Sequence, residues 1–265
     1  MTSLTVSLTN EQSRRTVVLQ WWIGVGIAVA VAALGLLTPQ KALTKAGVVH
    51  AAMLGLIVWG SLGWPGFGIV AVYFVLGTAV TKVGMKEKEA KGIAEKRGGA
   101  RGPENVWGSA LTGALCALGY AAWPHPLWVL GYIASFAAKL ADTTSSEVGK
   151  AYGKRTFSIV SFQPVPAGSE GAVSLEGTMA GWIAALALTA IGFALITRSS
   201  ALAMTWAWAI PCWIAAILAT TAESWIGATV QEDIAWMTNE VVNGIQTTIA
   251  AILAIAIVVL WQAIA

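Results

Sequence analysis

About eight apolar segments constrain the fold of this chain more strongly than any other feature of its sequence. A membrane-spanning helix needs roughly 20 mostly apolar residues, and most of the segments approach that length. They cover approximately 19–37, 47–62, 67–81, 107–123, 127–142, 176–197, 202–220 and 241–263. We therefore predict an all-α protein, a polytopic transmembrane helix bundle of about eight spans whose cytoplasmic loops form the active-site face.

The composition supports a single membrane domain. Of the 265 residues, 57% are hydrophobic and only 11% are charged, which is too apolar for a water-soluble protein of this size. Connections between the segments are short, so we expect one integral membrane domain over 1–265, with a polar N-terminal segment at 1–18. No small-residue cleavage pattern follows the first apolar run, which we interpret as a retained span. Cys116 and Cys212 lie in apolar runs and are assigned no role.

Turn residues and charges orient the spans. Gly63-Trp64-Pro65-Gly66 and Trp123-Pro124-His125-Pro126 predict tight hairpins, because proline stops a helix and glycine permits a turn. Lysine and arginine favour the cytoplasmic side, and most of them lie in connections that share one side if the spans alternate. We therefore expect cytoplasmic loops at 82–106, 143–175 and 221–240, and both termini on the opposite side. Nearly all acidic residues lie on the loop side too, which points to chemistry there.

A polar stretch begins at Asp142, at the end of the fifth apolar run, and its residue types suit a metal-bound phosphate. On a continuing helix Asp142, Ser145 and Gly149 share one face, so an acid, a hydroxyl and bare backbone would line one groove. A carboxylate suits a hard cation such as Mg²⁺, and glycine lets a phosphate approach closely. Three basic residues would offset the phosphate charge: Lys150, Lys154 and Arg155. The alternative, a solvated loop with interfacial lysines, is weaker because Asp142 lies so close to the hydrocarbon.

The run from Gly149 to Thr156 is not a Walker A motif. It is one residue short between its glycines, and Arg155 stands where serine or threonine should follow the lysine. Any nucleotide is therefore held in another way.

The stretch from Gly168 to Gly181 leads into the sixth apolar run. A Ser/Gly-rich approach to a helix N-terminus is a ready anion site. Glu176 is equally explained as a favourable charge against the helix dipole, so both interpretations stay open at this point.

Acidic and amide side chains without nearby cations mark the stretch at 220–244. Glu223, Glu240 and Asn243 lie at or inside the ends of apolar runs, and no lysine or arginine occurs in this stretch. Buried or interfacial acids need a cation or a distant basic partner, and a divalent metal is the simplest supplier.

The loop at 81–106 alternates acidic and basic residues. From Glu87 to Lys96 this pattern favours a solvated helix on the membrane surface. Arg97, Arg101 and Asn105 flank glycines just before the next span, where they could close over a phosphate. Anionic lipid head groups are a competing ligand for these residues.

The spacing D-x-x-S-x-x-x-G-x-x-x-G-K, from Asp142 to Lys154, resembles a signature of membrane enzymes that use CTP. These are phosphatidate cytidylyltransferase, dolichol kinase and phytol kinase. The longer strings at 141–150 and 170–178, with the loop at 81–106, more closely resemble the phytyl-phosphate kinase family of integral membrane proteins. That resemblance covers nearly the whole chain. It implies a kinase that uses CTP to phosphorylate phytyl monophosphate, or geranylgeranyl monophosphate, to the prenyl diphosphate used for tocopherol and phylloquinone side chains.

The resemblance also implies Mg²⁺ as a cofactor, CTP as the phosphoryl donor, and a set of site residues. The metal ligands would be Asp142, Glu223 and Glu240. The catalytic residues would be Asp142, Lys150, Lys154, Arg155 and Glu223. Nucleotide or phosphate would be bound by Ser145, Ser146, Glu147, Gly149, Gly153, Gly171, Ser174, Glu176, Gly177, Asn239 and Asn243. The prenyl phosphate would be bound by Lys82, Arg97, Arg101 and Asn105.

The expected partners are a prenyl phosphate with its lipid tail, a nucleotide and membrane lipids, without nucleic acid. A homodimer is left open. We expect a multi-pass protein of the plasma or thylakoid membrane of a photosynthetic organism, with its active site facing the cytoplasm. Two alternatives remain: a CTP-dependent cytidylyltransferase acting on a lipid phosphate, and a transporter of an anionic metabolite. A transporter also uses acidic residues inside the membrane, but it should carry polar residues toward both sides of the membrane.

Overall fold

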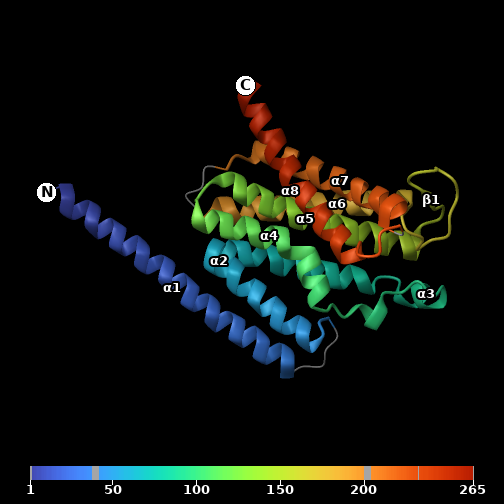
Figure 1. Cartoon of the computed structure of the whole chain (residues 1–265), viewed down its shortest axis with the longest axis horizontal. Helices are drawn as coiled ribbons and strands as arrows, with labels where there is room; N and C mark the ends of the chain where they lie inside the picture. The colour runs from blue at the N-terminus through green and yellow to red at the C-terminus, as the bar shows by residue number, and fades with distance from the viewer. Residues whose placement is uncertain (1, 38–41, 200–203, 232, 265) are drawn as a thin grey trace.

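The computed structural model describes residues 2–37, 42–199, 204–231 and 233–264, with the backbone alone for 2–17 and 96–97. The chain forms a bundle of helices with one small antiparallel sheet at the end where α3 also lies (Figure 1). The α-helices are α1 (Thr2–Leu37), α2 (Lys45–Lys82), α3 (Met85–Ala90), α4 (Pro103–Ala122), α5 (Pro126–Tyr152), α6 (Leu175–Ser199), α7 (Ala209–Ile226) and α8 (Asn239–Ile264). The sheet pairs β1 (Phe157–Ser158) with β2 (Ala172–Val173). Lys96–Gly99 and Trp206–Trp208 form 3-10 turns, and Gly227–Gln231 forms a π-helical turn.

The prediction of an all-α membrane protein is confirmed. Within the described residues, five helical segments are long and apolar enough to cross a bilayer: Val18–Leu37, Lys45–Lys82, Leu175–Ser199, Trp206–Gln231 and Asn239–Ile264. The α5 helix is also long, but Lys139 and Asp142 in its interior lower its hydropathy. The count of eight spans therefore stays a prediction.

The α2 helix consists of two halves that fold back on each other. Gly63 has a φ of 66°, which favours glycine, and Pro65 follows it. The rings of Trp59 and Phe67 lie 5.5 Å apart, whereas eight residues of straight helix would separate them by about 12 Å. The predicted hairpin at Gly63–Gly66 is therefore present.

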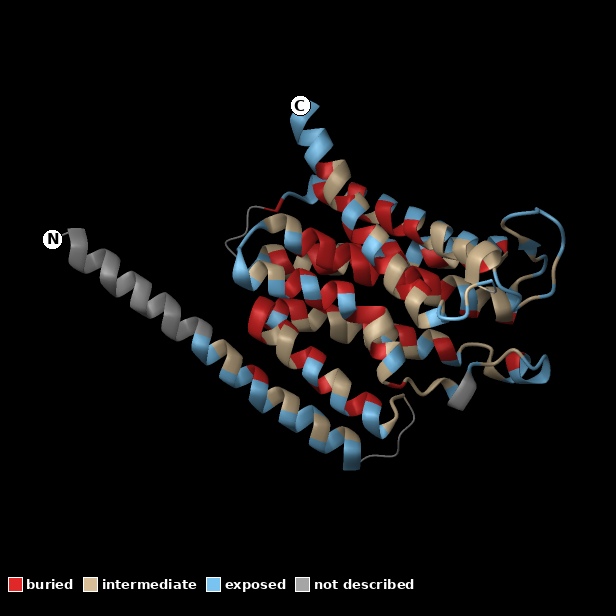
Figure 2. Cartoon of the chain, in the orientation of Figure 1, coloured by how far each residue is buried: buried red, intermediate tan, exposed pale blue. Residues whose placement is uncertain are grey.

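The α5 helix is the centre of the bundle and packs against α2, α4, α6, α7 and α8. Leu130, Ile133 and Phe136 are fully or almost fully buried, and Figure 2 shows the buried residues concentrated along this helix. Between them, alanines such as Ala134 and Ala137 let neighbouring helices approach closely, as small residues do in membrane bundles. The α1 helix lies along α2 instead and extends away from the bundle (Figure 1). Apolar side chains on α1, such as Trp22, are exposed.

Several predicted boundaries differ from the structure. The polar segment predicted at 1–18 is helical from Thr2, and the loops predicted at 143–175 and 221–240 begin inside α5 and α7. These helices run past their apolar parts because polar residues at their ends are paired by tertiary contacts. The interpretation of Glu87–Lys96 as a solvated surface helix is wrong for Lys88, which is fully buried in an ion pair with Glu147 of α5.

Candidate functional site

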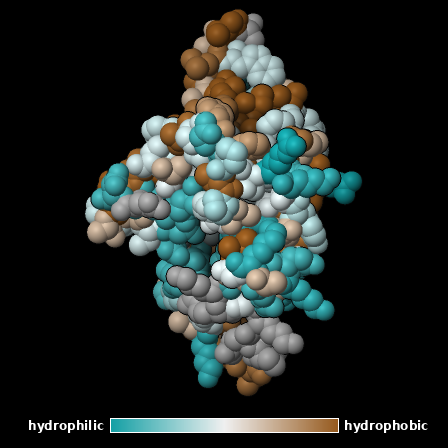
Figure 3. Space-filling view, turned by 90° about the vertical axis from the view of Figure 1, so that its right-hand side faces the viewer, coloured by the Kyte–Doolittle hydropathy of each residue, from teal (hydrophilic) through white to brown (hydrophobic). Residues whose placement is uncertain are grey.

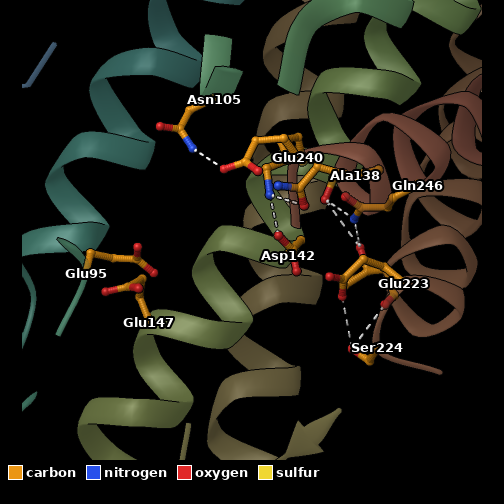
Figure 4. Close-up of polar contacts among 12 residues, drawn as sticks. Glu95, Asn105, Ala138, Asp142, Glu147, Glu223, Ser224, Glu240 and Gln246 are labelled. Atoms are coloured by element: carbon orange, nitrogen blue, oxygen red, sulfur yellow. Dashed lines mark hydrogen bonds and ion pairs between the residues drawn. The ribbon is translucent and has the colours of Figure 1, made fainter. Parts of the chain in front are cut away.

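The centre of the site is a buried lysine that the sequence analysis did not select. Lys139 of α5 is 7% exposed. Its Nζ atom donates to Oδ2 of Asp142, at 2.5 Å, and to Oδ1 of Asn243 on α8, at 2.8 Å. The carboxyl group of Glu223, on α7, lies beside Asp142 (Figure 4). Three helices thus converge on one lysine, two carboxylates and one amide.

An amide forms the floor of this central cluster, by which we mean Lys139, Asp142, Glu223 and Asn243. Gln246 is fully buried one turn along α8 from Asn243. Its Nε2 atom donates to the backbone oxygen of Ala138, at 3.0 Å, and to Oγ1 of Thr220, at 3.1 Å (Figure 4). These bonds fix α8 against α5 and α7 immediately beside Lys139.

Asn105 and Glu240 join the N-terminal ends of α4 and α8 at the rim of the site. Asn105 lies in the first turn of α4, where its Oδ1 atom accepts from the backbone N–H of Gly102 at 3.0 Å. Its Nδ2 atom donates to Oε1 of Glu240 at 2.9 Å (Figure 4). The two helices approach closely here, and only glycine at position 108 permits this approach. A Cβ atom on Gly108 would lie 2.7 Å from the backbone oxygen of Glu240.

Arg101 points its guanidinium group toward the bundle. Its NH1 atom donates to the Tyr73 hydroxyl at 3.1 Å, and its Cζ atom lies 5.6 Å from the centre of that ring. Tyr73 is buried against Phe136 and is close enough to Lys139 to interact with its charge. The backbone of Arg101 is held by hydrogen bonds to Ala42 and Thr44. This arrangement connects the loop before α4 to the centre of the site.

A second set of charges joins α3 to the C-terminal part of α5. Lys88 pairs with Glu147, with both side chains almost completely buried, and its Nζ atom also donates to the backbone oxygen of Thr81 at 2.8 Å. The Nζ atom of Lys150 lies 3.6 Å from Oε1 of Glu147 and 3.2 Å from Oε1 of Glu95. Partial burial acts to raise the pKa of Glu95, but the charge and hydrogen bond of Lys150 outweigh it and lower that pKa.

The structure brings some of the predicted site residues together and separates others. Asp142, Glu223 and Asn243 share the central cluster, and Asn105 and Glu240 meet at its rim. Lys82, Lys154, Arg155 and Asn239 are exposed at or beyond helix ends, and Ser146 is exposed on the surface of α5. The side chain of Arg97 lies outside the described residues. Lys150 and Glu147 belong to the α3 contact described above.

The glycines predicted to let a nucleotide approach lie mainly where α5 crosses α6. A Cβ atom on Gly177 would overlap the backbone oxygen of Ser145, and one on Gly149 would lie 3.1 Å from Oγ of Ser174. Ser174 begins α6 by accepting the Gly177 N–H at 3.1 Å. Gly153 contacts the same serine, Glu176 lies in the first turn of α6, and Gly171 has a φ of 66° beside Ala228. Close packing between α5 and the start of α6 therefore accounts for Gly149, Gly153 and Gly177, and the positive φ accounts for Gly171. A nucleotide role for these glycines stays a prediction.

A Mg²⁺ ion fits part of the predicted ligand set. Among the described residues no three Asp, Glu, His or Cys side chains gather as a metal site, and Glu240 is bonded to Asn105. Asp142 and Glu223 do lie together. Mg²⁺ usually binds through one or two carboxylates plus substrate phosphates, so this pair is sufficient for an ion that arrives with a nucleotide.

Lys139 and Gln246 are the residues of the site that sequence reasoning missed. A signal for Lys139 was available, because an ionisable residue inside an apolar run is expensive unless it has a partner or a function. It is also the distant basic partner that the acids of the stretch at 220–244 require. No comparable signal marks Gln246, whose partners become visible only when α5 and α7 are packed against α8.

Comparisons with known proteins place this chain in a family. The family model described as integral membrane protein DUF92 matches residues 27–251. An uncharacterized membrane protein of Synechocystis is 53% identical over 256 residues, which cover 95% of this chain and 96% of that protein. Protein VTE6, chloroplastic, of Arabidopsis thaliana is 45% identical over 223 residues, 80% of this chain and 64% of that protein. An uncharacterized membrane protein of Methanocaldococcus jannaschii is 31% identical over 59% of this chain and 64% of its own length. No solved structure matches the chain significantly.

Proposed function

The chain belongs to the DUF92 family of integral membrane proteins, and on this basis we propose that it is a CTP-dependent phytyl-phosphate kinase. It would convert phytyl monophosphate, and also geranylgeranyl monophosphate, to the prenyl diphosphate for tocopherol and phylloquinone synthesis. The observation that carries the proposal is the central cluster, in which two carboxylates, a lysine and an amide meet inside a membrane bundle. The sequence resemblance to phytyl-phosphate kinases supplies the substrate.

The proposed reaction requires positioning more than acid–base chemistry. A phosphate oxygen of the prenyl phosphate attacks the γ-phosphorus of CTP. The bond from that phosphorus to the oxygen that bridges the β- and γ-phosphorus atoms breaks, and CDP leaves. The attacking group is a phosphate monoester with a second pKa of about 6, so it is already ionised at neutral pH. Phosphoryl transfer is catalysed chiefly by alignment and by neutralisation of charge.

The residues divide into three groups in this proposal. Asp142 and Glu223 would hold Mg²⁺, which when bound neutralises charge on the phosphates. Arg101, just before α4, and Asn105, in its first turn, would hold the acceptor phosphate at the rim, because both side chains are directed toward the bundle. Three basic residues at or just beyond the C-terminal end of α5 would attract the nucleotide: Lys150, Lys154 and Arg155. The prenyl tail would lie against the apolar helix faces within the bilayer.

We place the site on the cytoplasmic side of a plasma or thylakoid membrane. Figure 3 looks at the end of the bundle that carries α3 and β1, and hydrophilic residues gather over much of this end. A water-soluble nucleotide would approach from this end, while the lipid substrate would enter from the side. A transporter should instead present polar groups toward both ends of its spans.

Incubation of the purified protein with CTP, Mg²⁺ and phytyl monophosphate tests the proposal. We expect CDP and phytyl diphosphate, measured by mass spectrometry and ³¹P NMR. Release of pyrophosphate with a CDP-linked lipid would contradict the kinase and support a cytidylyltransferase. Flux of an anionic metabolite into proteoliposomes without consumption of CTP would support a transporter.

A further inference from the structure

The ammonium group of Lys139 occupies a position built for a cation. It lies 2.5 Å from Oδ2 of Asp142 and 2.8 Å from Oδ1 of Asn243. Carboxylate and amide carbonyl oxygens are also the hard ligands that divalent ions choose. One lysine therefore sits among the oxygen atoms that a metal ion would need.

Among the described residues, the two carboxyl groups of the central cluster share one lysine, and both can be ionised together only if a second cation is present. Two carboxylates, Asp142 and Glu223, lie beside a single lysine, and buried charges are costly unless they are paired. A second cation near these oxygens would satisfy Glu223 but would repel the Lys139 ammonium. The four-carbon stem of lysine allows that ammonium to move to a new anionic partner.

A second observation is an unpartnered buried acceptor one turn along α8 from Asn243. The Oε1 atom of Gln246 is fully buried one turn from Asn243 and has no hydrogen-bond partner among the described residues. A buried acceptor of this kind normally bonds to water or to a ligand. The floor of the cluster thus has unused hydrogen-bonding capacity beside Lys139.

We propose that Lys139 is a built-in substitute for the divalent cation. In the nucleotide-free protein it neutralises Asp142, and when the metal enters with a nucleotide its ammonium moves to the nucleotide phosphates. Lys139 would therefore weaken metal binding in the absence of nucleotide and strengthen nucleotide binding in the presence of metal. The role of the nucleotide rests on the proposed function, whereas the competition with metal does not.

Binding of Mn²⁺, measured by electron paramagnetic resonance on purified protein without nucleotide, tests the competition. Lys139→Met and Lys139→Gln should bind Mn²⁺ more tightly than wild type, by roughly 5- to 150-fold, the usual range of coupling between two ligands. Lys139→Gln keeps a hydrogen-bond donor near Asp142 and Asn243, so the experiment can be done with this variant if Lys139→Met does not fold. Lys139→Arg keeps the charge and should bind Mn²⁺ no more tightly than wild type.

A matched control comes from another buried lysine. Lys88 is fully buried and paired with Glu147, away from the central cluster. The double variant Lys88→Met, Glu147→Leu removes this lysine together with its partner, so it should leave the Mn²⁺ affinity at its wild-type value. With CTP and Mn²⁺ both present, equilibrium dialysis should show weaker CTP binding to Lys139→Gln than to wild type. A role that is only structural would weaken both ligands.

Equal or weaker Mn²⁺ binding by a folded Lys139→Gln protein, or no Mn²⁺ binding by any form, would overturn the substitution mechanism. These measurements need no prenyl phosphate and no turnover. Tighter Mn²⁺ binding without any phosphoryl transfer would leave the mechanism in place and count only against the proposed kinase. The two proposals can therefore fail separately.

Discussion

Lys139 determines how the polar residues of three helices can coexist inside the bundle. Its ammonium bonds Asp142 within α5 and Asn243 on α8, and Glu223 of α7 lies next to Asp142. Removing one partner of a buried ion pair typically costs about 3–5 kcal/mol, because the remaining charge is left without compensation. The same residues therefore contribute both to stability and to the proposed chemistry, and variants must be chosen to separate these effects.

Replacement of Asp142 by asparagine is the most direct test at the level of single residues. The amide preserves the shape of the side chain and an oxygen for Lys139, but it removes the negative charge that would bind the metal. We expect turnover to fall by about 100-fold or more, as when a group that stabilises the transition state is lost. Release of CDP measures the effect, and size-exclusion chromatography in detergent checks that the protein remains folded.

Glu89→Gln provides the matched control for Asp142→Asn. It makes the same carboxylate-to-amide change at an exposed position on α3, so turnover should stay at the wild-type level. Undiminished activity in a folded Asp142→Asn protein would remove this residue from the proposed metal site.

The site residues differ in how visible they were in the sequence. Asp142, Glu223 and Asn243 were selected because they are polar residues at the ends of apolar runs. Lys139 was not selected, since it lies within the run at 127–142 and its partner Asn243 is 104 residues away. Glu147 was predicted to bind nucleotide, but its contact with Lys88 connects residues 59 apart, and no local pattern indicates that pairing.

At the level of elements, two contacts hold the C-terminal half of α5 in place. On one side α3 is attached through Lys88 and Glu147, and on the other α6 crosses at Gly177 and Gly181. Hydropathy predicted the apolar part of α5 correctly, but these contacts explain why the helix continues to Tyr152. Their contribution depends on tertiary packing, which a sequence pattern does not specify.

The buried ion pair between α3 and α5 gives a prediction about stability. Lys88→Met should destabilise the protein by about 3–5 kcal/mol, because among the described residues it leaves buried Glu147 with only Lys150, 3.6 Å away, as a cation. The double variant Lys88→Met, Glu147→Leu should recover most of this loss, because apolar pairs often replace buried ion pairs without cost. Thermal unfolding in detergent measures both. Equal destabilisation by the single and the double variant would show that the pair does not act as a unit.

The crossing of α5 and α6 gives a second prediction about packing. Gly177→Ala should destabilise the protein by about 1–3 kcal/mol, because the added methyl group overlaps backbone and forces the helices apart. Gly26→Ala is the matched control, since nothing lies within 4 Å of a Cβ atom there and alanine favours helix. Its stability should equal or exceed that of wild type in the same unfolding measurement. A stable Gly177→Ala protein would mean that the two helices can move apart without cost, and it would contradict close packing as the reason for this glycine.

At the scale of the whole molecule, polar and apolar residues are arranged along the bundle. The α3 helix, the β1–β2 sheet and the ends of α5 and α7 lie toward one end, and the link between α4 and α5 lies toward the other (Figure 1). The 27 residues of α5 separate these ends by about 40 Å, which is enough to cross a bilayer. The charge distribution in the sequence predicted this polarity, although the side of the membrane that each end faces follows only from the lysine and arginine rule.

Labelling of introduced cysteines tests that orientation. Glu89→Cys and Phe162→Cys should react with a membrane-impermeant maleimide from the same side, and His125→Cys from the opposite side, because exposed residues at the two ends face different compartments. The native Cys116 and Cys212 are buried and should remain unlabelled in the intact membrane, so they need not be removed.

In inside-out vesicles, which expose the cytoplasmic face, positions 89 and 162 should be labelled first, and CTP should be consumed there without permeabilisation. Labelling of position 125 with the other two from one side would contradict the crossing of α5, whereas labelling of 89 and 162 only in right-side-out vesicles would reverse the proposed orientation and place the nucleotide on the other face.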